Sequence, residues 1–313
     1  MIKVYHIINA LLLLTITSFA QQADSSLIKE LDNVVITATK SERKMGNIAI
    51  PTQVITSSMI KATGSLRLQD ILQEQTGLTL VNSPLGVSLA GFPNLFGAGI
   101  QMQGLDPAYT LILIDGEPLV GRNAGILKLG RIAVGNIRQI EIVKGPSSSL
   151  YGADAMAGVI NIITEKPSTR KVAVQLQYAA NRTVSAAVNY SERIKKTAVQ
   201  LFANRYSTSG YDLDKNIYGK TVDPFTDHSF GLKLTQYLST NSQLVLSARY
   251  FDETQKNNYL VTDQSAPQTV TGTTKEKDWG VNLQHIQQLS KSSKLTTRLY
   301  FNQYTNNSDV FLK

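Results

Sequence analysis

The sequence predicts a small α+β domain followed by antiparallel strands of a transmembrane β-barrel. Between Met45 and Pro167, short helical and extended patterns follow one another, as in an α+β domain. From Lys171 onward, apolar and polar residues alternate with a period of two, which is typical of strands with one apolar and one wet face. No segment reaches the roughly 18 apolar residues of a spanning helix. Any membrane span must therefore be a closed barrel.

Composition excludes several kinds of site. The chain has 313 residues, enough for two domains, and no cysteine, which excludes disulfides, thiolate metal sites and cysteine nucleophiles. The net charge is +8, but the basic residues are scattered along the sequence and do not cluster on a helix that could bind in a groove of DNA or RNA. We therefore expect no nucleic-acid partner. His6, His228 and His285 are widely spaced, and no catalytic set is recognisable. We expect no enzyme activity, metal site or cofactor.

The N-terminus has the organisation of an export signal. Lys3 precedes an apolar run from Ile7 to Leu14, and Ser18-Phe19-Ala20 places small residues where a signal peptidase reads them. We predict a signal peptide over residues 1–20 and an exported mature chain. A linker over residues 21–44 follows.

The linker contains one extended segment, LDNVVITATK, at about residues 31–40. Its β-branched centre favours an extended backbone, and its ends are polar. We interpret it as a strand without a partner in the chain. An ordinary first strand of the next domain is the simpler alternative.

Two short helices are expected early in the domain of residues 45–167. Ser57 is the expected N-cap of the first helix, which ends at Gly64. Ser65 is the expected N-cap of the second, which Gly77 ends. The second helix has core-facing residues at helical spacing, namely Leu68, Ile71, Leu72 and Gln75.

Short strands complete this domain. In TLILIDGEPLV, from Thr110, Asp115-Gly116 lies between apolar arms and predicts a two-residue hairpin. Gln139–Val143 and Gly158–Thr164 are the next expected strands. The result is a mixed sheet, from which no function follows by itself.

Three segments of this domain resemble the plug domain of TonB-dependent outer-membrane receptors of the siderophore and cobalamin type. They are DILQEQTGLTL from Asp70, TLILIDGEPL from Thr110, and the block from Ile137 to Pro167, IRQIEIVKGPSSSLYGADAMAGVINIITEKP. The resemblance implies a plug over residues 45–167 inside a barrel of about 22 strands. Residues 168–313 show only about the first seven strands, so we expect an incomplete barrel and a fragmentary sequence.

The resemblance also assigns the extended segment before the plug. In this family it is the TonB box, a periplasmic strand that adds itself to an edge of TonB. The matching residues are Asp32, Asn33, Val34, Val35, Ile36, Thr37 and Ala38. The implied partners are TonB with its inner-membrane energising complex, a small-molecule ligand and outer-membrane lipid. The implied location is the cell outer membrane.

Two glycine-rich segments, residues 91–97 and 120–124, are expected to be plug loops that face the ligand. The expected ligand-contacting residues are Phe92, Asn94, Phe96, Arg122 and Asn123. Packing of both phenylalanines beneath their loop is the structural alternative.

A lock of charges between plug and barrel is also implied. The family's usual Ile-Arg-Gly triplet is replaced here by a segment without arginine, Ile100-Gln101-Met102-Gln103-Gly104, so one lock arginine is missing. Arg138, Glu141 and Lys144 are the remaining candidates for the lock. The alternative is that they form the polar side of an alternating strand.

In the C-terminal half, each predicted strand has one apolar face. These faces are Val172, Val174, Leu176 and Tyr178; Val184, Ala186, Val188 and Tyr190; Phe230, Leu232 and Leu234; Leu244, Leu246, Ala248 and Tyr250; Trp279, Val281 and Leu283; and Leu295, Thr297, Leu299 and Phe301. The links near Asn181, Ile194, Thr240 and Ser292 are short. Ser207 to Asp227 and Glu253 to Glu276 are expected to be long polar loops on one side, which outer-membrane barrels present to the exterior.

The function implied by the resemblance is TonB-dependent active import of a scarce ligand, with the plug gating the barrel. An iron chelate, haem, cobalamin or a similar metal complex is the expected ligand, and the sequence does not choose among them. A binding-only surface receptor or adhesin remains an alternative. A ligand-sensing, signal-transducing receptor is another, although such receptors have an extra domain before the box and the linker is short.

Overall fold

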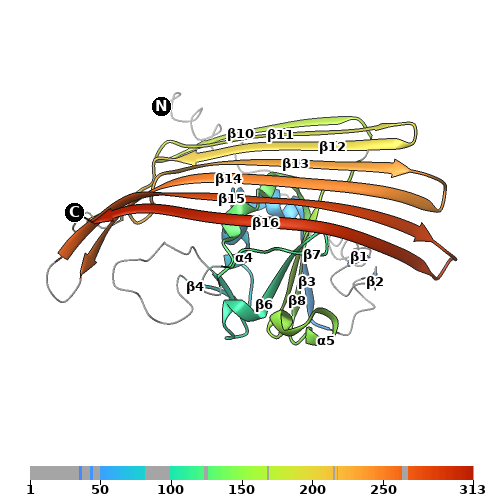
Figure 1. Cartoon of the computed structure of the whole chain (residues 1–313), viewed down its shortest axis with the longest axis horizontal. Coiled ribbons are helices and arrows are strands. Elements are labelled where there is room, and N and C mark those ends of the chain that lie inside the picture. Colours follow the sequence, from blue (N-terminus) through green and yellow to red (C-terminus); the bar gives the residue numbers. More distant parts are fainter. Residues whose placement is uncertain are drawn as a thin grey trace, which may run out of the picture.

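The computed structural model describes residues 35–36, 43–44, 50–81, 99–122, 126–167, 169–213, 216, 218–262 and 267–312. A small α+β domain lies against one face of a long seven-stranded sheet (Figure 1). The predicted combination of an α+β domain with antiparallel strands is confirmed. The predicted signal peptide, residues 1–20, lies outside the described residues.

The small domain is built on a five-stranded sheet with the order β3-β8-β9-β6-β7. Its strands are β3 (Thr52–Thr56), β6 (Thr110–Ile114), β7 (Glu117–Pro118), β8 (Ile137–Lys144) and β9 (Gly158–Thr164). The sheet is mixed, as predicted, because β6 and β9 are parallel and the other neighbours are antiparallel. Asp115 and Gly116 form the predicted hairpin turn with φ values of 52° and 85°, the positive values that a type I′ turn needs.

Two helices follow β3, with caps that differ from those predicted. Helix α3 (Ser57–Thr63) is capped by the Thr56 hydroxyl, which accepts from the Met59 amide at 3.4 Å, and it ends at Gly64 with φ of 67°. Helix α4 (Leu68–Gln73) has no side-chain cap, so Ser65 is not its cap. A backbone bridge to Ala133 holds Arg67 extended, and the helix begins only after it.

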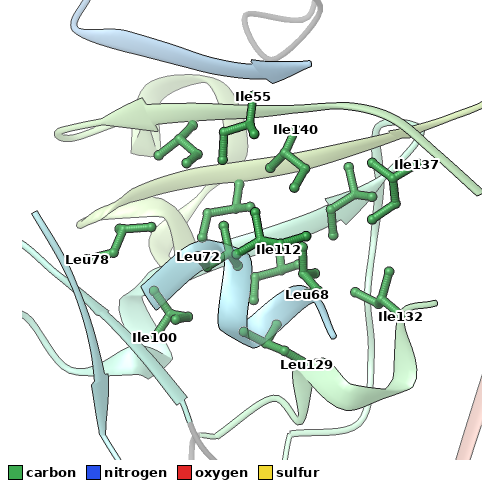
Figure 2. Close-up of a cluster of buried hydrophobic side chains, with 14 of the residues drawn as sticks. Ile55, Leu68, Leu72, Leu78, Ile100, Ile112, Leu129, Ile132, Ile137 and Ile140 are labelled. Atoms are coloured by element: carbon green, nitrogen blue, oxygen red, sulfur yellow. The ribbon is translucent and has the colours of Figure 1, made fainter. Parts of the chain in front are cut away.

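The core of the domain lies between α4 and the sheet. Figure 2 shows Leu68 and Leu72 of α4 facing Ile112 of β6 and Ile140 of β8, and these side chains are at most 3% exposed. The hairpin of β4 (Leu78–Val81) with β5 (Gly99–Met102) and the short helix α5 (Ser148–Tyr151) complete the domain. In the described part of the chain, no helix is both long and apolar enough to cross a membrane.

The second body is an antiparallel sheet in which each strand pairs with the next along the chain. Its strands are β10 (Lys171–Ala179), β11 (Thr183–Ile194), β12 (Thr197–Thr208), β13 (Phe225–Tyr237), β14 (Ser242–Thr262), β15 (Pro267–Gln288) and β16 (Lys294–Leu312). The seven strands and the short links between them are as predicted. The sheet is open, with β10 and β16 at its edges.

The two faces of this sheet differ as the period-two pattern predicts. On the face turned away from the small domain, Leu176 and Leu299 are 77% and 70% exposed, whereas Phe202 and Phe251 on the other face are 6% and 3% exposed. Phe230, Tyr250 and Trp279 pair directly across β13, β14 and β15 on the apolar face, and we name them the aromatic row. A side that exposes so much apolar surface requires a non-aqueous neighbour.

The predicted loop from Glu253 to Glu276 is wrong. β14 and β15 remain paired as far as Thr262 and Pro267, so the segment is a long hairpin. Figure 1 shows β14, β15 and β16 running well past the small domain at one end. In this segment both faces are polar, the inner one with buried Glu253 and Glu276 and the outer one with exposed lysines, so the hydrophobic alternation that identifies a strand disappears.

Replacing Leu72 by Ala tests the described core. Leu72 is fully buried, so we expect a loss of about 2–5 kcal/mol from the free energy of unfolding of the small domain. Faster amide hydrogen exchange in peptides from β8 and β9 would report it. Met59→Ala on α3 is the control because Met59 is 41% exposed. Equal exchange in the two variants would contradict this core.

Candidate functional site between the small domain and the strands

The structure places only part of the expected TonB box. Val35 and Ile36 form β1, which pairs antiparallel with β2 (Arg43–Lys44). The expectation of a strand without a partner is therefore wrong for these two residues. The remaining box residues, Asp32, Asn33, Val34, Thr37 and Ala38, lie outside the described residues.

Among the residues expected to contact ligand, Arg122 is described, and Phe92, Asn94, Phe96 and Asn123 lie outside the described residues. The Arg122 guanidinium donates to the carbonyl oxygens of Pro107 at 3.0 Å and Thr110 at 2.8 Å. Burial lowers its pKa below the usual value. These contacts fix the start of β6, and a role in ligand binding stays a prediction.

Arg138, Glu141 and Lys144 all lie on β8. Glu141 is fully buried and accepts from the Gln139 amide at 2.7 Å and the Asn161 amide at 3.3 Å. The Lys144 ammonium donates to the carbonyl oxygen of Thr76 at 2.7 Å. Both contacts are within the small domain. The proposed lock by these three residues stays a prediction, while other residues form the ion pairs to the strands.

Lys128 forms the first connection between the two bodies. Its ammonium lies 2.5 Å from a Glu253 carboxylate oxygen on β14 and 3.0 Å from one of Glu276 on β15. Glu253 and Glu276 are direct partners across the two strands, and like charges in that position repel each other. Burial alone would lower the pKa of Lys128, but the two carboxylates outweigh it and raise that pKa.

Arg131 forms the second connection, one short turn later. Its guanidinium donates to the Asp278 carboxylate at 3.0 Å and to the Val120 carbonyl at 2.9 Å. Arg131 and Asp278 are almost completely buried, at 1% and 0% side-chain exposure. Arg249 of β14 lies 2.7 Å from the same Asp278 oxygen, so two cations share one buried carboxylate. The Tyr304 ring of β16 stacks on Arg131, 4.4 Å from the guanidinium carbon.

The sequence orients these two cations through the residue between them. Leu129 is fully buried in the core of the small domain and begins the 3-10 turn Leu129–Arg131. The Arg131 side chain also donates to the Lys128 carbonyl at 3.2 Å. With Leu129 anchored inward, Lys128 and Arg131 on its two sides are held against the strands.

In a third connection the charges are reversed: the carboxylate belongs to the small domain and the cation to the strands. The Asp115 carboxylate in the β6–β7 turn accepts from the Lys233 ammonium of β13 at 2.9 Å and from the Thr164 hydroxyl at 2.7 Å. Burial alone would raise the pKa of Asp115, but Lys233 and Thr164 outweigh it and hold that pKa below its usual value. Next to this turn, Glu117 lies 3.4 Å from Arg298 of β16.

Close backbone contact accompanies these charges. Gly121 has φ of 86°, and a Cβ atom there would lie 2.2 Å from the Tyr304 ring. Between the small domain and strands β12 to β16 lies a space of about 660 Å³ that is open to solvent, with Asp115, Lys233, Arg249 and Asn302 in its lining. The interface thus combines tight contacts with a wet, charged gap. No group of acidic or histidine side chains in the described part of the chain is arranged to hold a metal ion.

Sequence reasoning missed Lys128, Arg131 and their acidic partners. A usable signal was present, because Glu276 and Asp278 share the face of β15 opposite to Trp279. Carboxylates on the inner face of a strand need cationic partners when they are buried.

A family model described as TonB-dependent Receptor Plug Domain matches residues 44–159. The small domain is a TonB-dependent receptor plug domain. A curated relative is the vitamin B12 transporter BtuB of Vibrio vulnificus (strain CMCP6), 28% identical over 214 residues, which are 68% of this chain and 32% of the relative. The chain thus spans about a third of that relative's length.

Solved structures share the arrangement of plug and strands. The siderophore receptor PiuA from Acinetobacter baumannii matches with a TM-score of 0.69 at 15% identity, over 88% of this chain and 39% of that one. The siderophore receptor PirA from the same organism matches with a TM-score of 0.56 at 17% identity, over 82% and 45%. At this identity the likeness shows the fold alone.

Replacing Lys128 by Met tests the connection to β14 and β15. The change removes the cation that Glu253 and Glu276 share and leaves Arg67 at 4.0 Å from Glu253. Removing one partner of a buried pair costs about 3–5 kcal/mol. We expect faster hydrogen exchange in the plug peptide over residues 126–137. Lys61→Met on α3 is the control because Lys61 is exposed. If both variants exchange like the wild type, Lys128 does not hold the plug.

The Asp115 connection predicts a pH dependence. In the folded protein the pKa of Asp115 lies below its ordinary value of 3.8, so between these two pKa values the unfolded state binds more protons than the folded state. The stabilisation from the Asp115–Lys233 pair is therefore fully present above pH 3.8. It is lost as the pH falls through the folded pKa. Hydrogen exchange of β6 and β9 between pH 7 and pH 3 measures this. Asp115→Asn should flatten the profile, and an unchanged slope would contradict the assignment.

Proposed function

We propose that the protein takes part in TonB-dependent import of a scarce ligand across the outer membrane. The observation that carries this proposal is the plug domain, held by buried ion pairs against the polar face of strands whose other face is apolar. The apolar face fits lipid, and the polar face fits a wet lumen. The plug then keeps that lumen closed at rest.

The ion pairs explain why opening needs an energised partner. Separating one buried pair without replacing its partner costs about 3–5 kcal/mol, many times the thermal energy. Lys128 and Arg131 each connect to buried carboxylates, and Asp115 adds a third connection. Spontaneous displacement of the plug is therefore rare. In the proposed mechanism, TonB pairs with the box at residues 31–40 and, driven through its inner-membrane energising complex, supplies the work.

The proposed ligand is a metal chelate or a cobalamin. The printed names of the relatives support this class, because they include a vitamin B12 transporter and siderophore receptors. The proposed role is binding and passage, without bond-making chemistry. The proposed ligand contacts remain Phe92, Asn94, Phe96, Arg122 and Asn123.

Growth on single ligands tests the proposal. Cells that depend on cobalamin, or on one ferric siderophore as the iron source, should grow with the gene and fail without it. Removing residues 31–40 should abolish uptake and leave ligand binding to whole cells unchanged, because the box contacts TonB alone. Binding without any energised uptake in the intact protein would instead indicate a surface receptor or adhesin.

A further inference from the structure

At one end of the sheet, β12 connects to β13 over residues 209–224 and β14 connects to β15. Outer-membrane barrels turn the end with the longer connections to the exterior. At this end the two faces of the strands have different charges. In Lys275-Glu276-Lys277-Asp278 of β15, Glu276 and Asp278 are buried against the plug, whereas both lysines are exposed on the opposite face. That opposite face is the apolar face that includes Trp279. The plug explains the buried carboxylates through Lys128 and Arg131. The plug does not account for Lys275 and Lys277, which are exposed on the opposite face.

The outward cations form one group across neighbouring strands. Register places Arg205, His228, Asp252 and Lys277 side by side, one step beyond the aromatic row. Lys275 and then Lys256 follow in the next two steps along the same face. We name Arg205, His228, Lys256, Lys275 and Lys277 the basic band.

The basic band keeps a net positive charge. This part of the face has two carboxylates, Asp252 and Asp309. It has four cations when His228 is counted as neutral, namely the arginine and the three lysines of the basic band. Arg205, Lys256, Lys275 and Lys277 are all exposed. Among the described residues, none of these four forms an ion pair within 4.0 Å. Their charges are therefore available to an anionic partner.

The depth of the basic band fits a lipid headgroup. Aromatic side chains at one level of a spanning sheet mark the boundary of the hydrocarbon layer. Successive same-face residues are about 6.6 Å apart along a strand, and a tilt of about 40° reduces this to about 5 Å of depth. Lys277 thus lies about 5 Å beyond the aromatic row, and Lys275 lies about 10 Å beyond it, from where its long flexible side chain reaches back toward the level of Lys277. Lipid headgroups occupy roughly the first 5–8 Å beyond the hydrocarbon.

We propose that the basic band binds the phosphate groups of lipids in the outer leaflet. This inference rests on the proposed function only in requiring that the strands span the outer membrane. Lysine and arginine close to a membrane surface bind anionic headgroups by about 1 kcal/mol each. The aromatic row below them contacts the acyl chains of the same lipid, so phosphate and chain are recognised together.

Lipid retention by the purified receptor in detergent tests the proposal. The probes are diphosphoryl lipid A, the same lipid without its phosphates, and inorganic phosphate, with bound lipid counted by native mass spectrometry. The intact protein should retain the phosphorylated lipid in preference to the dephosphorylated one. Lys275→Gln with Lys277→Gln should weaken that retention roughly tenfold to thirtyfold. Inorganic phosphate at millimolar concentration should not displace the lipid.

Lys291→Gln with Lys294→Gln is the matched control, because these residues are exposed at the opposite end of β15 and β16. It should retain lipid like the wild type. Equal retention of both lipids, equal loss in the control, or displacement by inorganic phosphate alone would overturn the proposal.

The two proposals fail separately. A protein that fractionates with the outer membrane and supports uptake, but shows no phosphate preference, refutes the lipid site alone. A protein absent from the outer-membrane fraction refutes the proposed function.

Discussion

The structure depends on a match of charges that neither body can provide alone. Glu253, Glu276 and Asp278 lie buried on the inner face of the strands, and the first two are direct partners across β14 and β15. Three carboxylates in such a position are strongly unfavourable without cations. Lys128 of the plug pairs with both Glu253 and Glu276. Arg131 of the plug shares Asp278 with Arg249 of β14. The inner face of these strands therefore requires a seated plug.

The polarity of the connections also fixes how the plug sits. Near β14 and β15 the plug contributes cations and the strands contribute carboxylates, whereas at the β6–β7 turn Asp115 and Glu117 meet Lys233 and Arg298. A rotated plug would bring like charges together. Gly121 against Tyr304 adds a steric condition to the electrostatic one. Orientation is thus specified by several contacts that are spread over β13 to β16.

The sequence allowed the fold to be predicted more fully than the site. Period-two alternation located the apolar faces of the strands, and Asp115-Gly116 located the hairpin turn, because each is a local pattern. The cap of α4 was misplaced since a long-range bridge of Arg67 to Ala133, which local pattern does not contain, sets the helix start. The hairpin of β14 and β15 was missed because both of its faces are polar: the inner face has buried carboxylates, and the outer face has exposed lysines. Lys128 was missed for a third reason: its partners are 125 and 148 residues away.

Trp279 gives the molecule a built-in optical reporter. It is the single tryptophan of the chain and lies in the aromatic row, 37% exposed and with its ring 5.1 Å from that of Phe301. Its indole is on the side of the sheet away from the plug. In the proposed membrane arrangement its ultraviolet emission therefore reports on the hydrocarbon boundary. Lipids brominated at successive carbons would dim that emission to different extents. The position of the sheet along the bilayer normal can thus be read without attaching any dye.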